Sequence, residues 1–431
     1  MVDNNSPTRG SFRGWQRGRG AARGWRGQKS GRPTPAAPVK KPSPSHIKTD
    51  LGPLIEQFQT LPSTTVRARI TTVKPICSYS WVEAANGPTI LVPSSPPVWT
   101  KESPQRVPAD TGTRFSDQNS ARMGPKLSPL IPIFASIDHM EADVDLGSFD
   151  FITDRNNLLK LLHWATNAEE YDDFRIDVEL GGKTCFLTRT DENDIDVIEG
   201  FRGYGEEYHK AVTKWPKGSE GATGHHRAIS IDLDGVKILL RFEIDARVEI
   251  QEDSKDSKDD VDDLADALSS LLTSSSKASA KKTSSFAGLT VKSSGDKAMI
   301  PQSSIMKLKT RAEHKPLNMD DVGPQIYLSQ TPHLYLAKHV RGDFQPAQRI
   351  LPDNDKIELQ LGKLREALLD IVEVVREQAQ GEGLCLVCVD RKLELYKRKP
   401  GTGREVGWEI MSKFVSEPLT GGGSRSWGDD A

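Results

Sequence analysis

The chain has few cysteines and no long apolar run, and both absences exclude classes of protein. Its 431 residues contain only four cysteines, too few and too scattered for a secreted domain held by disulfides. No apolar stretch approaches the length that crosses a bilayer, and none near the start resembles a signal peptide. We therefore expect a soluble protein of a reducing compartment. The four cysteines are Cys77, Cys185, Cys385 and Cys388.

The chain also has almost no net charge, −2 at pH 7, yet its charges are segregated. The first fifty residues hold eleven Lys and Arg against Asp3 and Asp50 alone. Arginines beside glycines, interleaved with Phe12, Trp15 and Trp25, are typical of disordered segments that neutralise phosphates and stack on bases. We interpret the segment as an RNA-binding tail, with a merely solubilising arm as the alternative. Its arginines are Arg9, Arg13, Arg17, Arg19, Arg23 and Arg26.

Two predicted strands bring acids and lysines to where they can meet. In RFEIDARVE and SSIMKLKTRA, alternation puts Glu243 and Asp245 on one strand face, and Lys307 and Lys309 on another. Two carboxylates and a lysine at neighbouring strand ends can hold a divalent metal and aim a water at a phosphodiester. An isolated strand of this kind is more often a solvated edge strand. The apolar residues expected to face the core are Phe242, Ile244, Met306 and Leu308.

Further segments contain DFITDRNNLLKLL with Arg155, GYGEE with Glu207, and Gln330 before the predicted strand HLYLAKH. Together with Glu243 and Asp245, and in this order, they resemble the decapping and deNADding exoribonucleases, the DXO-like (RAI-like) family with a PD-(D/E)XK-type nuclease core. Arg155 in DFITDRNNLLKLL matches the family's arginine position, and GYGEE matches its Gly-aromatic-x-x-Glu motif, with Glu207 as the acid. Glu243 and Asp245 match its Glu-hydrophobic-Asp motif, and Gln330 matches a glutamine at a helix end. The similarity runs from about residue 78 to residue 344 and is that of a divergent member.

The resemblance implies a metal-dependent hydrolase. Glu207, Glu243 and Asp245 would coordinate one or two Mg²⁺ or Mn²⁺ ions, which clamp the scissile phosphate and lower the pKa of an attacking water. Lys309 would orient that water or stabilise the charge that develops on the phosphate. Gln330 would bind a water or a phosphate oxygen at the edge of the site.

The implied substrate is RNA with a modified or unprocessed 5′ end, held at a phosphate by Arg155. Relatives remove aberrant or NAD-type caps, release pyrophosphate from triphosphate ends, or degrade RNA from 5′ to 3′, and the sequence does not choose among these activities. We expect a role in mRNA decapping and RNA quality control. The expected location is nuclear, with the cytoplasm as the alternative, and a 5′–3′ exoribonuclease is a candidate partner.

The chain departs from the family at Lys307, where a metal-binding glutamate would stand and where only Lys309 of the Glu-hydrophobic-Lys motif is matched. A cation at this position repels a metal, so metal affinity should fall. Lys307 could turn away and leave the other acids to suffice, an acid such as Glu313 could replace it, or activity could be lost. We assign Lys307, with Arg155, to substrate binding. The second hypothesis is a catalytically degenerate RNA-binding module or partner of an exonuclease.

Hairpin turns, alternating strands and an amphipathic helical stripe predict a mixed α/β (α+β) fold with a central mixed sheet flanked by helices. We expect one nuclease-type domain formed by residues 61–250 and 301–415. Residues 1–60 would be the tail and a proline-rich linker, and residues 416–431 a disordered end. Residues 251–300, acidic and then serine-rich, would form a disordered insertion without a core of its own.

Overall fold

The computed structural model describes part of the chain, all of it within one compact unit that spans residues 37–431. The arginines of the predicted RNA-binding tail lie outside the described residues, as do residues 251–282 and 415–431. The described ranges are 44–60, 66–104, 106–169, 172–198, 201, 203–219, 221–249, 283–295, 299–379 and 381–414.

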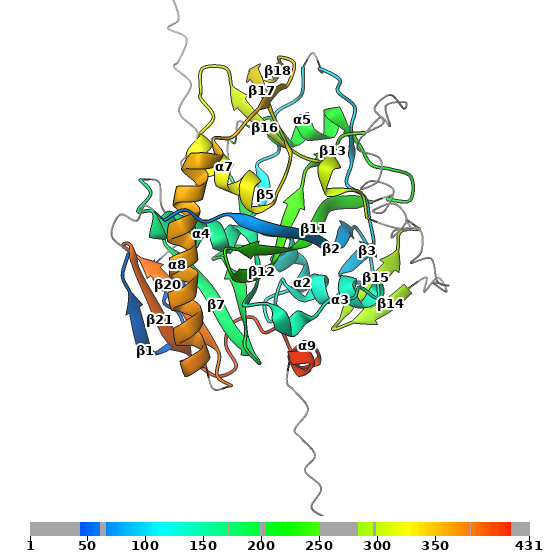
Figure 1. The fold of residues 1–431 in the computed structure, drawn as a ribbon. Coiled ribbons are helices and arrows are strands. Elements are labelled where there is room, and N and C mark those ends of the chain that lie inside the picture. The colour runs from blue at the N-terminus through cyan, green and yellow to red at the C-terminus, as the bar shows by residue number, and fades with distance from the viewer. Residues whose placement is uncertain are drawn as a thin grey trace, which may run out of the picture. The chain divides into compact units, whose positions relative to one another are not determined.

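A mixed sheet of twelve strands runs through the described part of the chain (Figure 1). At its centre β6 pairs in parallel with both β8 and β12, whereas β11 and β12 form an antiparallel hairpin. The strands, in spatial order, are β1 (Leu51–Phe58), β21 (Lys392–Arg398), β20 (Leu384–Val389), β7 (Phe174–Gly181), β8 (Thr184–Thr190), β6 (Phe151–Asp154), β12 (Val236–Ile244), β11 (Ala222–Leu233), β2 (Ile70–Val82), β3 (Thr89–Val92), β15 (Leu289–Ser293) and β14 (Thr283–Phe286).

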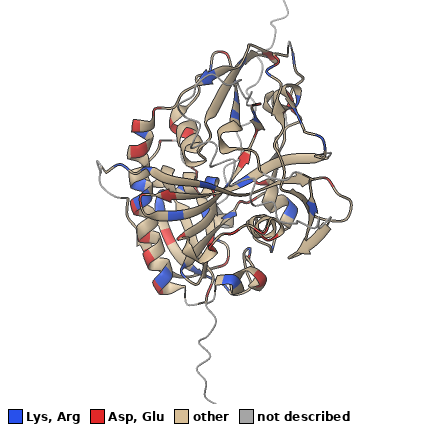
Figure 2. Cartoon of the chain, turned by 45° about the vertical axis from the view of Figure 1, so that its right-hand side comes forward, with Lys and Arg blue, Asp and Glu red and all other residues tan. Residues whose placement is uncertain are grey.

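Helices cover both faces of this sheet. Alternation along the strands sends Phe151 and Leu240 to the face packed under α4 (Arg155–Ala165) and α8 (Asn354–Gln378), and Ile152 and Leu239 to the face under α3 (Ile131–His139). Residues of both charge signs lie along α8 (Figure 2). The predicted central mixed sheet flanked by helices is confirmed.

Side-chain caps fix where several helices begin. Asp154 accepts a hydrogen bond from the Asn157 amide at the start of α4, and Asn318 caps α7 in the same way. No helix among the described residues is long and apolar enough to span a membrane. The remaining helices are α1 (Pro44–Ile47), α2 (Gln118–Met123), α5 (Gly205–Val212), α7 (Met319–Leu328) and α9 (Trp408–Met411), with short 3-10 helices at Leu146–Ser148, Gln302–Ser304 and Ser412–Phe414.

A smaller sheet begins where the large one ends. The chain leaves β12 at Ile244 and enters β13 (Ala246–Arg247) one residue later, so Asp245 lies at the junction of the two sheets. β13 pairs with β16 (Ile305–Ala312), which runs parallel to β17 (His333–Val340). The other strands are β10 (Thr213–Lys214), β4 (Val98–Trp99), β18 (Asp343–Phe344) and β19 (Gln348–Ile350), and a separate ribbon pairs β5 (Thr113–Phe115) with β9 (Ile195–Val197).

Two expected boundaries need correction. Residues 283–293, placed by the sequence in the disordered insertion, form the β14–β15 hairpin, and β15 pairs in parallel with β3. Phe286, Leu289 and Val291 supply buried apolar surface to the core under α3. β1, which was expected in the N-terminal linker, pairs with β21 at the opposite edge of the sheet. β15 gains apolar contacts that its serine-rich surroundings in the sequence do not reveal, and β1 pairs with a strand more than three hundred residues later in the chain.

The hairpin gives a stability prediction. Leu289→Ala should lower the free energy of unfolding by about 2–5 kcal/mol, because the Leu289 side chain is fully buried. Lys292→Ala, on an exposed neighbour in the same strand, is the control and should change it by less than about 0.5 kcal/mol. Urea unfolding of the two variants checks this. If both variants changed the free energy of unfolding equally little, the hairpin would not be part of the folded core and would belong to the insertion.

Candidate functional site

The predicted acids and lysines meet at the junction of the two sheets. Asp245 follows the last residue of β12, and the pairing of Ala246 with Met306 sets β16 beside it. The apolar residues between them are buried as expected, with Phe242 3%, Ile244 4%, Met306 1% and Leu308 2% exposed. Strand alternation therefore places Glu243 and Asp245, and Lys307 and Lys309, away from the core.

Lys307 does not turn away from the site, because it forms an ion pair with Asp245. The distance from Lys307 Nζ to Asp245 Oδ1 is 2.5 Å, and the two side chains are only 14% and 6% exposed. The other carboxylate oxygen of Asp245 accepts a hydrogen bond of 2.8 Å from the Leu308 amide. Burial alone would raise the pKa of Asp245, but these partners hold it below its usual value. Asp245 is therefore an ionised carboxylate with both oxygens engaged.

Glu243 is the carboxylate that still faces solvent. No hydrogen bond or ion pair of its side chain is found among the described residues, and the side chain is exposed. Surrounding protein nevertheless desolvates it and raises its pKa, with Lys307 opposing and Asp245 adding to the rise. Glu243 therefore accepts a proton more readily than an ordinary glutamate.

Lys309 and Arg155 bring two further cations to the same place. Lys309 Nζ has a long hydrogen bond of 3.4 Å to Gln325 Oε1. Burial, followed by repulsion from Lys307, lowers the pKa of Lys309 to about 8. Arg155 begins α4, and its Nη1 donates to Ser329 Oγ at 3.1 Å.

Arg155 is also held by its surroundings. Its guanidinium lies over the Phe242 ring, 5.6 Å from the centroid, which fixes its plane. Burial lowers the pKa of Arg155, while the charges of Asp245 and Glu243 raise it. An arginine remains charged in any protein environment. These charge effects join five residues in one electrostatic cluster, namely Arg155, Glu243, Asp245, Lys307 and Lys309.

Three side chains at the cluster were not expected from the sequence. His209 Nε2 donates to the Leu308 carbonyl at 3.2 Å, and burial lowers the His209 pKa, so that the ring is neutral. Gln325 contacts Lys309 through Oε1 and Asp321 through Nε2, the latter at 3.1 Å. The negative charge of Asp321 also opposes the lowering of the pKa values of Lys309 and Arg155. The available signal was closeness in sequence to motif residues, since His209 follows Glu207 on α5 and both Asp321 and Gln325 lie on α7, the helix before Gln330.

Glu207 and Gln330 match motif positions in the sequence, but their side chains contact other residues in the structure. Glu207, on α5, pairs with Lys210 at 2.7 Å. The Gln330 side chain donates to the Tyr327 carbonyl at 2.6 Å and so closes the end of α7. Within the described residues, no hydrogen bond or ion pair links either side chain to Glu243 or Asp245, and the roles predicted for Glu207 and Gln330 stay predictions. Gln325 is the glutamine that contacts Lys309.

The residues of the cluster do not fit a divalent metal ion in this arrangement. Both oxygens of Asp245 are already engaged, one of them by a cation. Among the residues that the structure describes, no three His, Cys, Asp or Glu side chains gather closely enough to hold a metal. The positive charges of the cluster balance its negative charges, so no excess negative charge attracts a metal ion. The cations are Arg155, Lys307 and Lys309, and the carboxylates are Glu243, Asp245 and Asp321. The predicted metal site remains a prediction.

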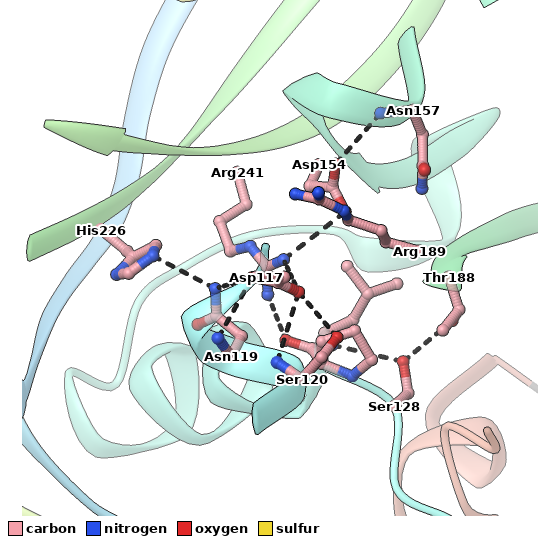
Figure 3. Close-up of polar contacts among 12 residues, drawn as sticks. Asp117, Asn119, Ser120, Ser128, Asp154, Asn157, Thr188, Arg189, His226 and Arg241 are labelled. Carbon is pink, nitrogen blue, oxygen red and sulfur yellow. Dashed lines mark hydrogen bonds and ion pairs between the residues drawn. The ribbon is translucent and has the colours of Figure 1, made fainter. Parts of the chain in front are cut away.

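A buried polar network lies next to the cluster, along β12 and at the start of α4 (Figure 3). Arg241, two residues before Glu243 on β12, has Nη2 at 3.5 Å from Asp154 and 3.8 Å from Asp117. Asp154 caps α4, whose first residue is Arg155, and Asp117 caps α2. Nearby, Asn119 Nδ2 lies 3.1 Å from His226 Nε2. The network ties the strand that carries Glu243 to the helix that carries Arg155.

Comparison with known families gives one match. The family model described as "Domain of unknown function (DUF8563)" matches residues 54–394, which is most of the chain. The match includes β12, β16 and α4, and so every residue of the cluster. Comparison with curated proteins finds no match.

Solved structures of Rai1 are similar to this chain. Rai1 of S. pombe has 11% identity and a TM-score of 0.54, over 79% of this chain and 99% of that one. A mutant of S. pombe Rai1 in complex with 3′-FADP has 12% identity and a TM-score of 0.51, over 79% and 98%. Scheffersomyces stipitis Rai1, solved with (3′-NADP)⁺ and calcium, has 12% identity and a TM-score of 0.49, over 84% and 99%. The chain therefore has a Rai1-like fold.

Proposed function

This chain belongs to the family described as Domain of unknown function (DUF8563), and we propose that it binds RNA by a phosphorylated 5′ end. The observation that carries the proposal is that two cations, Arg155 and Lys309, both contact Gln325 beside the junction of the two sheets. Arginine binds phosphate oxygens through a planar fork, and lysine binds them as a compact charge. Within the described residues, the Lys309 ammonium makes only a long hydrogen bond, so it retains donors for a ligand.

The similarity to Rai1 supports this substrate class. The similar structure of mutant S. pombe Rai1 was solved in complex with 3′-FADP, a ligand with phosphate groups. The predicted tail with Arg9 to Arg26 would add affinity for RNA of any 5′ end, because arginine neutralises backbone phosphates without reading the terminus. Nuclear location and a 5′–3′ exoribonuclease partner stay predictions.

Metal-dependent hydrolysis of RNA 5′ ends is the second candidate. Glu243 and Asp245 beside Lys309 favour it, since this is the residue set that the resemblance to decapping nucleases singled out. Cap removal, NAD-cap removal, pyrophosphate release and 5′–3′ degradation all belong to this candidate. A metal could reach Asp245 only after Lys307 had left it. We therefore prefer binding of the 5′ end to hydrolysis as the proposed function.

The proposal is tested with short RNAs that differ only at the 5′ end. Full-length protein should bind an oligoribonucleotide with a 5′ phosphate more tightly than the same oligoribonucleotide with a 5′ hydroxyl. Comparing the two at one salt concentration removes the contribution of the tail, which acts on both equally. Equal affinity for both RNAs would refute the proposal.

The preference for a 5′ phosphate should depend on pH through Lys309. Its pKa of about 8 means that the ammonium is largely charged at pH 7 and largely neutral at pH 9. The phosphate monoester is a dianion throughout this range. The preference should therefore fall as pH rises from 7 to 9, by up to about tenfold per pH unit above the pKa. Fluorescence anisotropy of the two RNAs measures it.

Lys309→Arg is the matched control for this titration, because arginine stays charged over the whole range. The variant should keep a preference that changes little between pH 7 and pH 9. A wild-type preference that stays flat over the same range would show that Lys309 does not contact the phosphate.

A further inference from the structure

We propose that Lys307 takes the electrostatic place of a metal ion and makes this a metal-independent site for the terminal phosphate of RNA. The inference rests on the proposed function and names how the same site holds its ligand. Lys307 is then the residue that determines whether the site works without a divalent cation.

The first step concerns Asp245. A carboxylate beside a phosphate-binding site repels the phosphate unless a cation stands between them, and divalent ions commonly fill that role. Here the cation is the Lys307 ammonium, 2.5 Å from Asp245 Oδ1. The pair is largely shielded from water, and the Leu308 amide fixes the other oxygen. Asp245 therefore anchors Lys307 instead of a metal.

The second step concerns the donors that remain for a phosphate. Lys309 lies on the same face of β16 as Lys307, two residues further along the strand. Burial and the neighbouring positive charge of Lys307 lower the pKa of Lys309. An anion that binds here would offset the repulsion between the two lysines. Among the described residues, the hydrogen bonds of Arg155 use only Nη1, which leaves Nε and Nη2 for a ligand.

The third step concerns Glu243, the one exposed carboxylate of the cluster. Among the described residues no hydrogen bond or ion pair holds its exposed side chain, so Glu243 can turn away from an entering phosphate. One acid of the cluster is thus neutralised by an ion pair, and the other is not fixed beside the phosphate.

The experiment measures the preference for a 5′-phosphorylated over a 5′-hydroxyl oligoribonucleotide, with the full chain, in EDTA and in Mn²⁺. For the wild type we expect the same preference in both, within about twofold. Lys309→Met should lower it by about tenfold or more in both, which is the worth of one charged hydrogen bond. Lys292→Met, an exposed lysine at the far edge of the large sheet, should leave it unchanged.

Lys307 variants separate this inference from the function on which it rests. Lys307→Glu should lose the preference in EDTA and recover it in Mn²⁺, whereas Lys307→Met should lose it in both. Thermal melting confirms that each variant is folded. A wild-type preference that appears only with Mn²⁺ would overturn the metal-independent site and leave the proposed function intact. Absence of any preference in either condition would overturn both.

Discussion

Replacing Lys307 with glutamate should make the melting temperature of the protein rise when Mn²⁺ is added. The substitution removes the ammonium that engages Asp245 and sets a third carboxylate beside Asp245 and Glu243. Three carboxylates attract a hard divalent cation through oxygen ligands. A ligand that binds only the folded state stabilises it by about 2.7 kcal/mol at a concentration one hundred times its Kd. Melting curves with and without millimolar Mn²⁺ measure this.

The same variant tests whether the fold retains hydrolytic capacity. If the metal recruited by Lys307→Glu lies where a phosphate binds, 5′-modified RNA should be cleaved in Mn²⁺. Adding Asp245→Ala to it should abolish both the stabilisation and the cleavage. Lys307→Met removes the cation without adding a ligand, and should respond to Mn²⁺ less than Lys307→Glu. No response to Mn²⁺ in Lys307→Glu would show that residue 307 does not face a metal-binding position.

Replacing Arg241 with methionine should cost about 3–5 kcal/mol of folding free energy. Arg241 is 2% exposed and lies between the carboxylates of Asp154 and Asp117, both also buried. Methionine preserves much of the side-chain length but removes the ion-pair partner of two buried acids, which leaves only the charge of Arg189 acting on them. The loss should be largest at neutral pH and smaller in acid, because a protonated carboxyl no longer needs a counter-charge. Urea unfolding at pH 7 and pH 5 measures it.

An exposed ion pair supplies the control for Arg241. Lys356 pairs with Asp320, and the two side chains are 57% and 60% exposed. Lys356→Met should therefore cost less than about 1 kcal/mol. An equally small cost for Arg241→Met would mean that the network in Figure 3 does not stabilise the strand and helix that carry Glu243 and Arg155.

The residues at the candidate site could be predicted wherever strand alternation decides the direction of a side chain. Glu243 and Asp245 follow buried neighbours at a period of two, and Lys307 and Lys309 do the same on β16. The sequence could not predict the ion pair between Lys307 and Asp245. It depends on the chain changing sheets at Asp245, which sets the register of β13 against β16. Register between strands far apart in sequence is not a local property.

Helical positions were harder to predict than strand positions. Glu207 and Gln330 match motif positions, but the rotation of α5 and the end of α7 direct them to Lys210 and to the Tyr327 carbonyl. Each step along a helix turns the side-chain direction by about 100°. A motif match on a helix therefore predicts the direction of a side chain less well than a motif match on a strand does. Gln325, a little more than one turn before Gln330, is the glutamine that contacts Lys309.

Composition hid the β14–β15 hairpin within a segment rich in serine and lysine. Phe286, Leu289 and Val291 supply its buried apolar side chains, and the paired residues of β3 lie 201 positions earlier in the chain, as in Thr290 with Thr89. A pairing of this kind depends on tertiary contacts that outweigh local propensity. The buried arginine network had a similar origin, since Arg241 reads as an ordinary charged strand residue until Asp117 and Asp154 are placed around it.

The central claim, that a lysine holds the place of a metal, is tested most directly by titrating Mn²⁺ into the wild-type protein and following free Mn²⁺ by electron paramagnetic resonance. Acidic segments elsewhere can bind Mn²⁺ weakly, so the same titration is made with Asp245→Asn. The account predicts identical curves for the two proteins, with and without 5′-phosphorylated RNA, because Lys307 already occupies Asp245. A stoichiometric Mn²⁺ site in the wild type that Asp245→Asn removes would contradict it.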